Sequence, residues 1–410
     1  MSQKNGLEIY VHIPFCVKKC NYCDFLSAPA DKRLHNRYAG ALLREIQFYG
    51  AQFGRVPVST IYIGGGTPSA VDAEYIALIL KQLMVCFDVM SDAEITIECN
   101  PGTLTADKLL IYKEAGVNRL SIGLQSAFDD ELKELGRIHT YKQFLENYDL
   151  ARKCGFDNIN IDLMSALPYQ TTEKFITSLK RIMQLRPEHI SAYSLIIEKG
   201  TPFYERYKFD AVLRDAGKMP KILPSEDTEY EIYKSTQKLL TEHGYHHYEI
   251  SNYAKPGYEC RHNTGYWTRV PYLGVGLGAS SLLDNVRYTN IPDIGDYLNL
   301  CDSIKCRQQE MIKKSGDTIA IPISSLHADV QLVERHAQME EFLFLGLRMT
   351  GGITRGDFYE SFGTEIEAVY GEVLQNLAKE ELVELKAGNI RLTDKGMDIS
   401  NYVLAQFLLD

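Results

Sequence analysis

The sequence predicts an α/β protein whose main part is an open, partial barrel of six βα units, followed by a mixed segment and a small helical domain. Two observations indicate this architecture. Six short apolar runs with strand-like composition recur along the first 200 residues, and amphipathic runs with helical periodicity lie between them. Strands that alternate with helices are typical of a parallel sheet. Six units are fewer than the eight of a closed barrel, so we expect the barrel to stay open.

Each expected element follows this alternation in order. The expected strands are Glu8–Ile13, Thr60–Ile63, Glu94–Cys99, Asn118–Ile122, Asn158–Leu163 and Ile190–Leu195. The expected helices are Tyr38–Phe48, Glu74–Phe87, Ala106–Glu114, Tyr141–Lys153, Glu173–Leu185 and Glu226–His243. We assign residues 1–200 to the barrel and 201–300 to a region that completes it, where Tyr245–Tyr288 shows little helical periodicity. In such sheets ligands bind at the carboxyl ends of the strands.

The last quarter of the chain changes character. Asp302–Asp329 is polar and irregular, so we interpret residues 301–337 as a linker or insertion. Residues 338–410 predict helices at Met339–Arg348, Arg355–Tyr359 and Glu365–Glu381, a hairpin of Val383–Lys386 and Asn389–Leu392 turning at Ala387-Gly388, and a last helix from Asp394. This order resembles a winged helix. From Glu334 to Asp410 there are 7 Lys and Arg against 14 Asp and Glu, so a packing or partner domain is favoured over DNA binding.

Composition sets the broad class of protein. The chain has 410 residues, 45% hydrophobic and 24% charged, as expected for a globular protein of more than one domain. Its net charge of −10 does not favour nucleic-acid binding. No apolar run is long enough for a membrane span, and no secretory apolar segment opens the chain. The nine scattered cysteines predict reduced thiols and a cytoplasmic location.

Three cysteines carry the strongest chemical signal. Cys16, Cys20 and Cys23 lie on the loop that leaves the first strand at Pro14. Three thiolates can hold three irons of a [4Fe–4S] cluster and leave the fourth iron open. Zinc is the alternative, but zinc usually takes four ligands in two pairs, and no second CxxC pair is present.

This CxxxCxxC spacing directly after a first strand resembles the signature of the radical S-adenosylmethionine (SAM) superfamily. The run from Tyr10 to Cys16 is similar to the branch that contains oxygen-independent coproporphyrinogen III oxidases and heme chaperones of the HemW group, and the resemblance extends over most of the chain. It implies a [4Fe–4S] cluster, bound SAM and a low-potential electron donor. Reduction of the cluster would cleave SAM to methionine and a 5′-deoxyadenosyl radical.

The resemblance also implies which residues contact SAM. They lie in the first strand, between the cysteines or near the ends of later strands: Tyr10, Tyr22, Gly65, Gly66, Thr67, Glu98, Gln125, Arg137 and Asp162. Chemistry supports several roles, since a terminal carboxylate such as Glu98 can accept from ribose hydroxyls and Arg137 can grip a carboxylate in bidentate fashion. Each of these residues also has an interpretation without a ligand. The glycines can form a simple turn, Glu98 can be a surface residue, and Tyr22 can pack in the core. His139 is a candidate proton donor, although a loop histidine is more often structural.

Three positions depart from the family pattern. Ala166 and Tyr169 stand where glycines are usual, which puts the shape of that loop in question. Ser280 stands where a histidine is common, after Gly276-Leu277-Gly278-Ala279.

Two features separate the oxidases from the chaperones. The oxidases have a further cysteine two residues after the third ligand, where this chain has Phe25, and a longer segment before the first strand, where this chain has nine residues before Tyr10. The chaperone group has an HNxxYW motif, matched here by His262, Asn263, Tyr266 and Trp267. The resemblance implies heme ligation by His262 with flat contacts from the two aromatic residues. Alternatively, His262 and Asn263 satisfy backbone groups in a turn.

The resemblance therefore predicts a protein that binds a [4Fe–4S] cluster, SAM and heme and transfers heme to an acceptor protein. A transiently membrane-associated protein is one candidate acceptor. The alternative is an enzyme, either an oxygen-independent coproporphyrinogen III oxidase or another radical SAM enzyme that acts on a tetrapyrrole. A scaffold with a vestigial cluster is a third hypothesis. We assign no catalytic residue.

Overall fold

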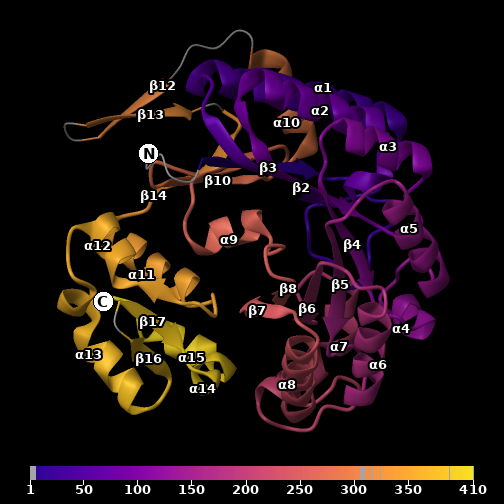
Figure 1. The fold of residues 1–410 in the computed structure, drawn as a ribbon. Helices are drawn as coiled ribbons and strands as arrows, with labels where there is room; N and C mark the ends of the chain where they lie inside the picture. The colour runs from indigo at the N-terminus through magenta and orange to yellow at the C-terminus, as the bar shows by residue number, and fades with distance from the viewer. Residues whose placement is uncertain (1–5, 305–309, 315–316, 324, 387, 410) are drawn as a thin grey trace.

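A large curved sheet with helices on its outer side forms most of the molecule (Figure 1). The computed structural model describes residues 6–304, 310–314, 317–323, 325–386 and 388–409. The six predicted parallel strands are β1 Leu7–Ile13, β2 Pro57–Gly65, β3 Asp88–Cys99, β4 Arg119–Gln125, β5 Ile159–Ser165 and β6 His189–Ser194. They lie side by side in chain order, which confirms the partial α/β barrel.

Helices cover the outer face of these strands. They are α1 Lys32–Phe53, α2 Ala73–Cys86, α3 Ala106–Glu114, α4 Asp129–Glu134, α5 Tyr141–Lys153 and α6 Thr172–Met183, and α8 Glu226–Glu242 packs on α6. Helix α1 begins earlier than predicted because the Asp31 side chain accepts a hydrogen bond from the Leu34 backbone N–H and caps the helix. Helices α7 Pro202–Asp215 and α10 Ile294–Ser303 were not predicted.

Further strands extend the sheet at both edges. On one side β9 Tyr272–Val275 pairs in parallel with β1, and β10 Ser280–Leu283, β11 Val286–Asn290 and β14 His327–Leu332 follow in antiparallel. On the other side β8 Asn252–Ala254 and β7 His246–Glu249 follow β6. The description of Asp302–Asp329 as irregular was wrong: it contains β12 Glu310–Lys314, β13 Asp317–Ile323 and the start of β14. Polar composition misled the prediction, since an edge strand such as β14 keeps much of its surface in solvent.

The two faces of the parallel strands differ sharply in polarity. Side chains alternate between faces along a strand. The outer positions, such as Ile61, Ile97 and Ile122, are fully buried in the main hydrophobic core beneath the helices. The inner positions carry polar groups: Glu8, Thr60, Tyr62, Glu94, Glu98, Arg119, Ser121, Asn160, Asp162, His189 and Ser191. The open barrel therefore has a polar interior.

Residues after β14 form a second hydrophobic cluster, from Met339 to Phe407. Its elements are α11 Arg335–Gly346, β15 Ile353–Thr354, α12 Arg355–Phe362, α13 Ile366–Lys379, β16 Val383–Lys386, β17 Asn389–Leu392, α14 Asp394–Asp398 and α15 Ser400–Ala405. The predicted helices and hairpin are present, and β15 adds a third strand beside β17. Ala387 of the predicted turn lies outside the described residues.

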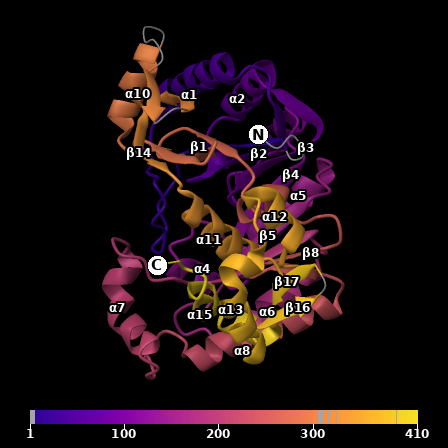
Figure 2. The same ribbon diagram turned by 90° about the vertical axis from the view of Figure 1, so that its left-hand side faces the viewer.

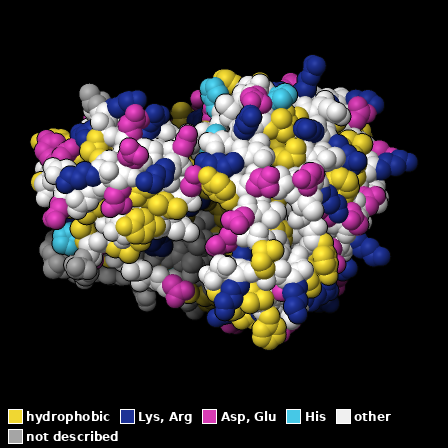
Figure 3. Space-filling model, turned by 90° about the horizontal axis from the view of Figure 1, so that it is seen from below, with side chains coloured by type: hydrophobic (Ala, Val, Ile, Leu, Met, Phe, Trp, Pro, Cys, Tyr) yellow, Lys and Arg dark blue, Asp and Glu magenta, His cyan; other side chains and the backbone are white. Residues whose placement is uncertain are grey.

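The C-terminal elements lie at the end of the molecule away from α1 and α2 (Figure 2). They contact the barrel through two ion pairs of the buried Glu341 carboxylate on α11, with Arg269 at 3.1 Å and with the partly exposed Arg287 at 2.9 Å. On the face seen from below, Lys and Arg side chains are interspersed with Asp and Glu (Figure 3). Among the described residues, no helix has the length and apolar character needed to cross a bilayer.

The two positions where glycine is usual in the family adopt backbone that glycine prefers. Ala166 has φ 56° and Tyr169 has φ 60°, both in the left-handed region. This conformation costs roughly 1–2 kcal/mol for a residue with a Cβ. The loop thus keeps the shape of a glycine loop, at some cost in stability.

Replacing Tyr169, whose side chain is 70% exposed, by glycine should therefore stabilise the protein. Relief of the left-handed backbone outweighs the extra flexibility of the unfolded chain by about 0.5–1 kcal/mol. Thermal unfolding of Tyr169→Gly should show a higher Tm. Tyr359→Gly, an exposed site within α12, should lower Tm by comparison. Equal destabilisation by both substitutions would contradict this account.

The polar interior also predicts a pH effect at Glu8. Burial raises the pKa of this carboxyl from 4.5 to about 9, repulsion from Glu94 adds to the shift, and Thr60 and Arg261 oppose it. His262 also faces Glu8, with its Nδ1 3.9 Å from the carboxylate. Because the folded pKa lies above the unfolded value, the wild type should lose stability as pH rises from about 4.5 to about 9.

Glu8→Gln should remove this loss, so its Tm should exceed that of the wild type at pH 8 and approach it at pH 5. Glu360→Gln, an exposed site on α12, serves as the control. A variant whose Tm followed the wild type in parallel across this range would show that Glu8 is ionised in the folded protein.

Candidate functional site

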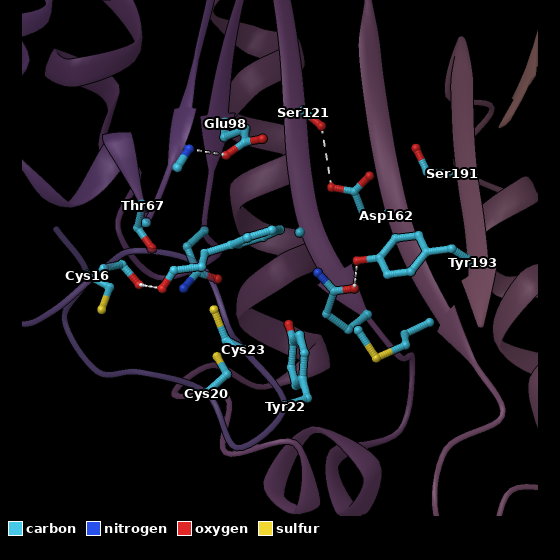
Figure 4. Close-up of a pocket in the computed structure, with 18 of the residues that line it drawn as sticks. Cys16, Cys20, Tyr22, Cys23, Thr67, Glu98, Ser121, Asp162, Ser191 and Tyr193 are labelled. Carbon is cyan, nitrogen blue, oxygen red and sulfur yellow. Dashed lines mark hydrogen bonds between the residues drawn. The ribbon is translucent and has the colours of Figure 1, made fainter. Parts of the chain in front are cut away.

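A cavity of about 470 Å³ opens at the carboxyl ends of the parallel strands and continues along their inner face (Figure 4). Twelve of the predicted site residues line it: Cys16, Cys20, Tyr22, Cys23, Gly65, Gly66, Thr67, Glu98, Gln125, Arg137, Asp162 and Asn263. Tyr10, His262, Tyr266 and Trp267 do not line it. The fold thus gathers side chains from many strand ends into one site.

The cysteine loop is held at its base and at its tip. At the base, the Cys16 N–H donates to the Ala28 carbonyl at 3.2 Å, and His12 Nε2 hydrogen-bonds with the Leu26 carbonyl at 2.9 Å. At the tip, the Asn21 backbone N–H donates to the Leu135 carbonyl at 2.9 Å. These bonds place the three cysteines at one end of the cavity (Figure 4).

The cysteines fit an iron–sulfur cluster better than a single metal ion. Three thiols lie on one loop beside the Arg137 guanidinium, whose Nη1 donates to Cys20 Sγ at 3.6 Å. In a cluster each thiolate binds a different iron, so the sulfurs need not converge. Within the described part of the chain, no three His, Cys, Asp or Glu side chains converge on a point that suits one ion.

The glycines after β2 let the backbone approach the start of the cysteine loop. Gly65 has φ +117°, and a Cβ on Gly66 would lie 2.6 Å from the Phe15 carbonyl oxygen. The Gly66 N–H donates to Ile13 at 2.9 Å and the Thr67 N–H to Phe15 at 2.7 Å. This run is therefore required by close packing as well as being part of the cavity wall.

Glu98 is held in a fixed orientation at the end of β3. Its Oε1 accepts from the Tyr62 hydroxyl and its Oε2 from the Gly65 N–H, both at 3.0 Å. Burial raises the pKa of Glu98 to about 7; Asp162 adds to the shift, and the bonds from Tyr62 and Gly65 oppose it. The carboxylate is a positioned acceptor in the cavity wall.

Arg137 and Gln125 complete the opposite wall. Arg137 donates to the Asn100 side chain and the Gly123 carbonyl, and its buried Nε has no partner in the described structure. Gln125 has the left-handed φ of 76°, and its Oε1 accepts from the Tyr193 hydroxyl at 2.9 Å. Strained backbone of this kind is common at functional sites.

Two other predicted residues have different surroundings. Asp162 is not left unpaired, because Asn160 Nδ2 donates to it at 2.7 Å and Ser121 Oγ at 3.4 Å. His139 is buried and does not line the cavity, and burial together with Arg137 lowers its pKa to about 3. Its neutral, enclosed ring agrees with the structural interpretation rather than with a proton donor.

The HNxxYW motif forms a helix, α9 Arg261–Trp267, at the base of the barrel interior (Figure 1). A helix here was not predicted. Glu94 on the inner face of β3 accepts from the backbone N–H groups of Arg261 at 3.1 Å and His262 at 3.2 Å. The first turn of α9 is therefore satisfied by a carboxylate, as helix N-termini favour.

His262 is enclosed within this arrangement. Its side chain is 1% exposed, Nδ1 hydrogen-bonds with Thr60 Oγ1 at 2.7 Å, and Nε2 with the Tyr266 hydroxyl at 3.1 Å. The expectation that it satisfies backbone groups in a turn was wrong, since both partners are side chains. Burial, with a smaller effect of Arg119, lowers the pKa of His262 to about 3, so the ring is neutral.

The rest of α9 is wedged between the sheet and α11. A Cβ on Gly265 would lie 2.0 Å from Glu8 Oε1, so any other residue there would displace the Glu8 carboxylate. The Trp267 ring lies 4.5 Å from the Arg348 guanidinium, next to the end of α11, and the Tyr266 ring contacts Tyr272.

Several cavity residues were not singled out from the sequence, notably Arg119, Ser191, Tyr193 and Asn252. The sequence signal for them is a polar residue at alternate positions of an otherwise apolar strand, as Arg119, Ser121 and Gln125 show in β4.

Comparison with known proteins places the chain in a family. The Radical SAM superfamily matches residues 10–182, and the HemN C-terminal domain matches residues 333–399. The chain is 34% identical to the heme chaperone HemW of Lactococcus lactis subsp. lactis (strain IL1403), over 98% of this chain and 97% of that protein. It is 36% identical to the heme chaperone HemW of Bacillus subtilis (strain 168), over 97% of this chain and 98% of that protein.

Among solved structures, the chain resembles coproporphyrinogen III oxidase (HemN) from Escherichia coli, described as a radical SAM enzyme. The TM-score is 0.79 at 24% identity, over 99% of this chain and 91% of that chain, and this likeness shows the fold. The two bacterial relatives that match over the full length at 34% and 36% identity are both heme chaperones. The chain belongs to the HemW family of radical SAM proteins.

Proposed function

We propose that this chain is a heme chaperone: it binds a [4Fe–4S] cluster, SAM and heme, and transfers heme to an acceptor protein. The observation that carries the proposal is that one cavity extends from the cysteine loop to α9, the helix that bears the heme-associated motif. The names of its full-length relatives support the same function.

The proposed cluster ligands are Cys16, Cys20 and Cys23. When bound and supplied by a low-potential electron donor, the cluster provides the electron that reductive cleavage of SAM requires. The protein's own contribution is to position SAM and exclude water.

The proposed SAM contacts follow from the cavity wall. Glu98 offers an oriented carboxylate to the ribose hydroxyls, Arg137 a guanidinium to the SAM carboxylate, and Tyr22 an aromatic face to the adenine. Gly65, Gly66, Thr67, Gln125 and Asp162 supply the remaining surface. Tyr10 acts from outside the cavity, through its hydrogen bond with His12 at 3.0 Å.

Heme ligation by His262 requires a change at α9. A heme iron binds a neutral imidazole nitrogen that has a free lone pair. The low pKa keeps His262 neutral, but Thr60 and Tyr266 occupy both nitrogens. We propose that α9 moves away from Thr60 when heme binds and that the hydrogen bond between His262 and Tyr266, which lies within α9, opens. Asn263, Tyr266 and Trp267 would then contact the macrocycle, and the contacts of α11 with Arg269 and Trp267 oppose this movement.

A second candidate function is the oxygen-independent coproporphyrinogen III oxidase reaction. The observation that favours it is the depth of the cavity, which reaches Arg119 inside the barrel and offers space beyond the SAM residues. Phe25, in the place of the oxidases' further cysteine, opposes it.

The test uses anaerobically reconstituted protein. Heme titration followed by absorption should show a histidine-ligated spectrum for the wild type. His262→Ala should weaken binding at least about tenfold, since the loss of an axial ligand exceeds about 1.4 kcal/mol. Tyr266→Phe should bind heme faster, because it keeps the ring but frees Nε2. His336→Ala, an exposed histidine on α11, is the matched control, and Tm values show whether each variant folds.

The same preparations, given SAM, reductant and coproporphyrinogen III, should form no protoporphyrinogen. Stoichiometric 5′-deoxyadenosine with loss of two carboxyl groups would establish the oxidase instead. Heme binding that is equal in the wild type and in folded His262→Ala would refute the ligand assignment.

A further inference from the structure

A buried arginine at the base of the cavity has no ion-pair partner. Arg119, the first residue of β4, is 1% exposed and lines the cavity. Buried arginines are normally paired. Among the residues that the structure describes, no carboxylate lies within ion-pair distance of Arg119, and its buried Nε has no hydrogen-bond partner.

The acidic groups nearest in the barrel interior are engaged elsewhere. Glu94 accepts from the backbone N–H groups that open α9, and Asp162 accepts from Asn160 and Ser121. They offset the charge of Arg119 through space without using its N–H groups. The guanidinium therefore keeps its donors free and stays charged at any physiological pH.

Two amide side chains that share the cavity lining with Arg119 also have polar groups without a hydrogen-bond partner among the described residues. Asn263 on α9 makes no side-chain hydrogen bond in the described structure. Asn252 donates through Nδ2 to Glu249, which fixes its orientation, and its buried Oδ1 has no partner. The base of the cavity thus has a free cation, a free amide and an oriented acceptor.

We propose that Arg119 and Asn263 form a carboxylate-binding subsite at the base of the cavity. A guanidinium binds a carboxylate through two parallel N–H···O bonds, and the Asn263 amide can donate a third.

This subsite is separate from the one proposed for the SAM carboxylate. Arg137 donates to the carbonyl of Gly123, four residues beyond Arg119 on β4. At roughly 3.3 Å per residue, the two strand positions lie about 13 Å apart. A carboxylate at Arg119 would also contact α9 directly beside His262.

Two sources supply this chemistry: a propionate side chain of a tetrapyrrole, or a small free carboxylic acid. The first rests on the proposed heme function, and the second does not. The experiment therefore has one arm for each source, both on reconstituted protein.

In the first arm, the affinities of heme and heme dimethyl ester are measured by absorption. The wild type should prefer heme by about tenfold, the size of one charge-assisted contact. Arg119→Gln should bring this ratio close to one if its Tm shows that it folds. Asn263→Leu should lower the ratio without abolishing it, because the two guanidinium bonds remain. Arg33→Gln, which removes an exposed arginine, should leave the ratio unchanged.

In the second arm, propionate is titrated while Tm is recorded. It should raise Tm in the wild type and in Arg33→Gln, less in Asn263→Leu, and not in folded Arg119→Gln. Preference for heme without a propionate effect assigns the subsite to the tetrapyrrole, and a propionate effect without heme binding keeps the subsite but rejects the chaperone function. Equal affinity for heme and its ester together with no propionate effect would overturn the subsite and leave the chaperone proposal standing.

Discussion

The polar inner face of the six parallel strands is the constraint on which the rest of the structure depends. Strand alternation commits the outer positions to the hydrophobic core, so the inner ones place several carboxylates and an arginine inside the barrel. Buried polar groups are costly unless they are partnered. Helix α9 supplies partners at the base, through its N–H groups on Glu94 and His262 on Thr60. Above it, the groups remain open to the cavity.

The position of α9 connects three parts of the molecule. Gly265 allows it to approach Glu8 on β1, and Asn263 takes part in the cavity wall. On its other side, Trp267 contacts Arg348, while Arg269, just beyond the helix, pairs with Glu341 on α11. A movement of α9 would therefore change contacts both in the cavity wall and in the C-terminal domain. In the proposed function, this packing would link the heme site to the SAM site without turnover of SAM.

Much of this arrangement could be predicted from the sequence, for reasons that are local. The parallel strands follow from apolar runs, and the cysteine loop and the residues near strand ends, such as Glu98 and Arg137, follow from where those strands stop. The left-handed backbone at Tyr169 agrees with the glycine of the family pattern, so the departure in sequence did not change the loop. The predictions that failed concern contacts between residues that are far apart in the sequence. The partners of His262 include Thr60, 202 residues away in sequence, and no local pattern indicates that contact. Edge strands such as β14 are too polar and short to stand out.

The central claim is that His262 is enclosed in the absence of heme and is released with α9 when heme binds. Hydrogen–deuterium exchange of the reconstituted protein, with and without heme, tests it most directly. The account predicts slow exchange across residues 261–267 without heme, and faster exchange there and in α11 once a His262-ligated spectrum is present. A His262-ligated heme with unchanged protection of α9 would contradict it.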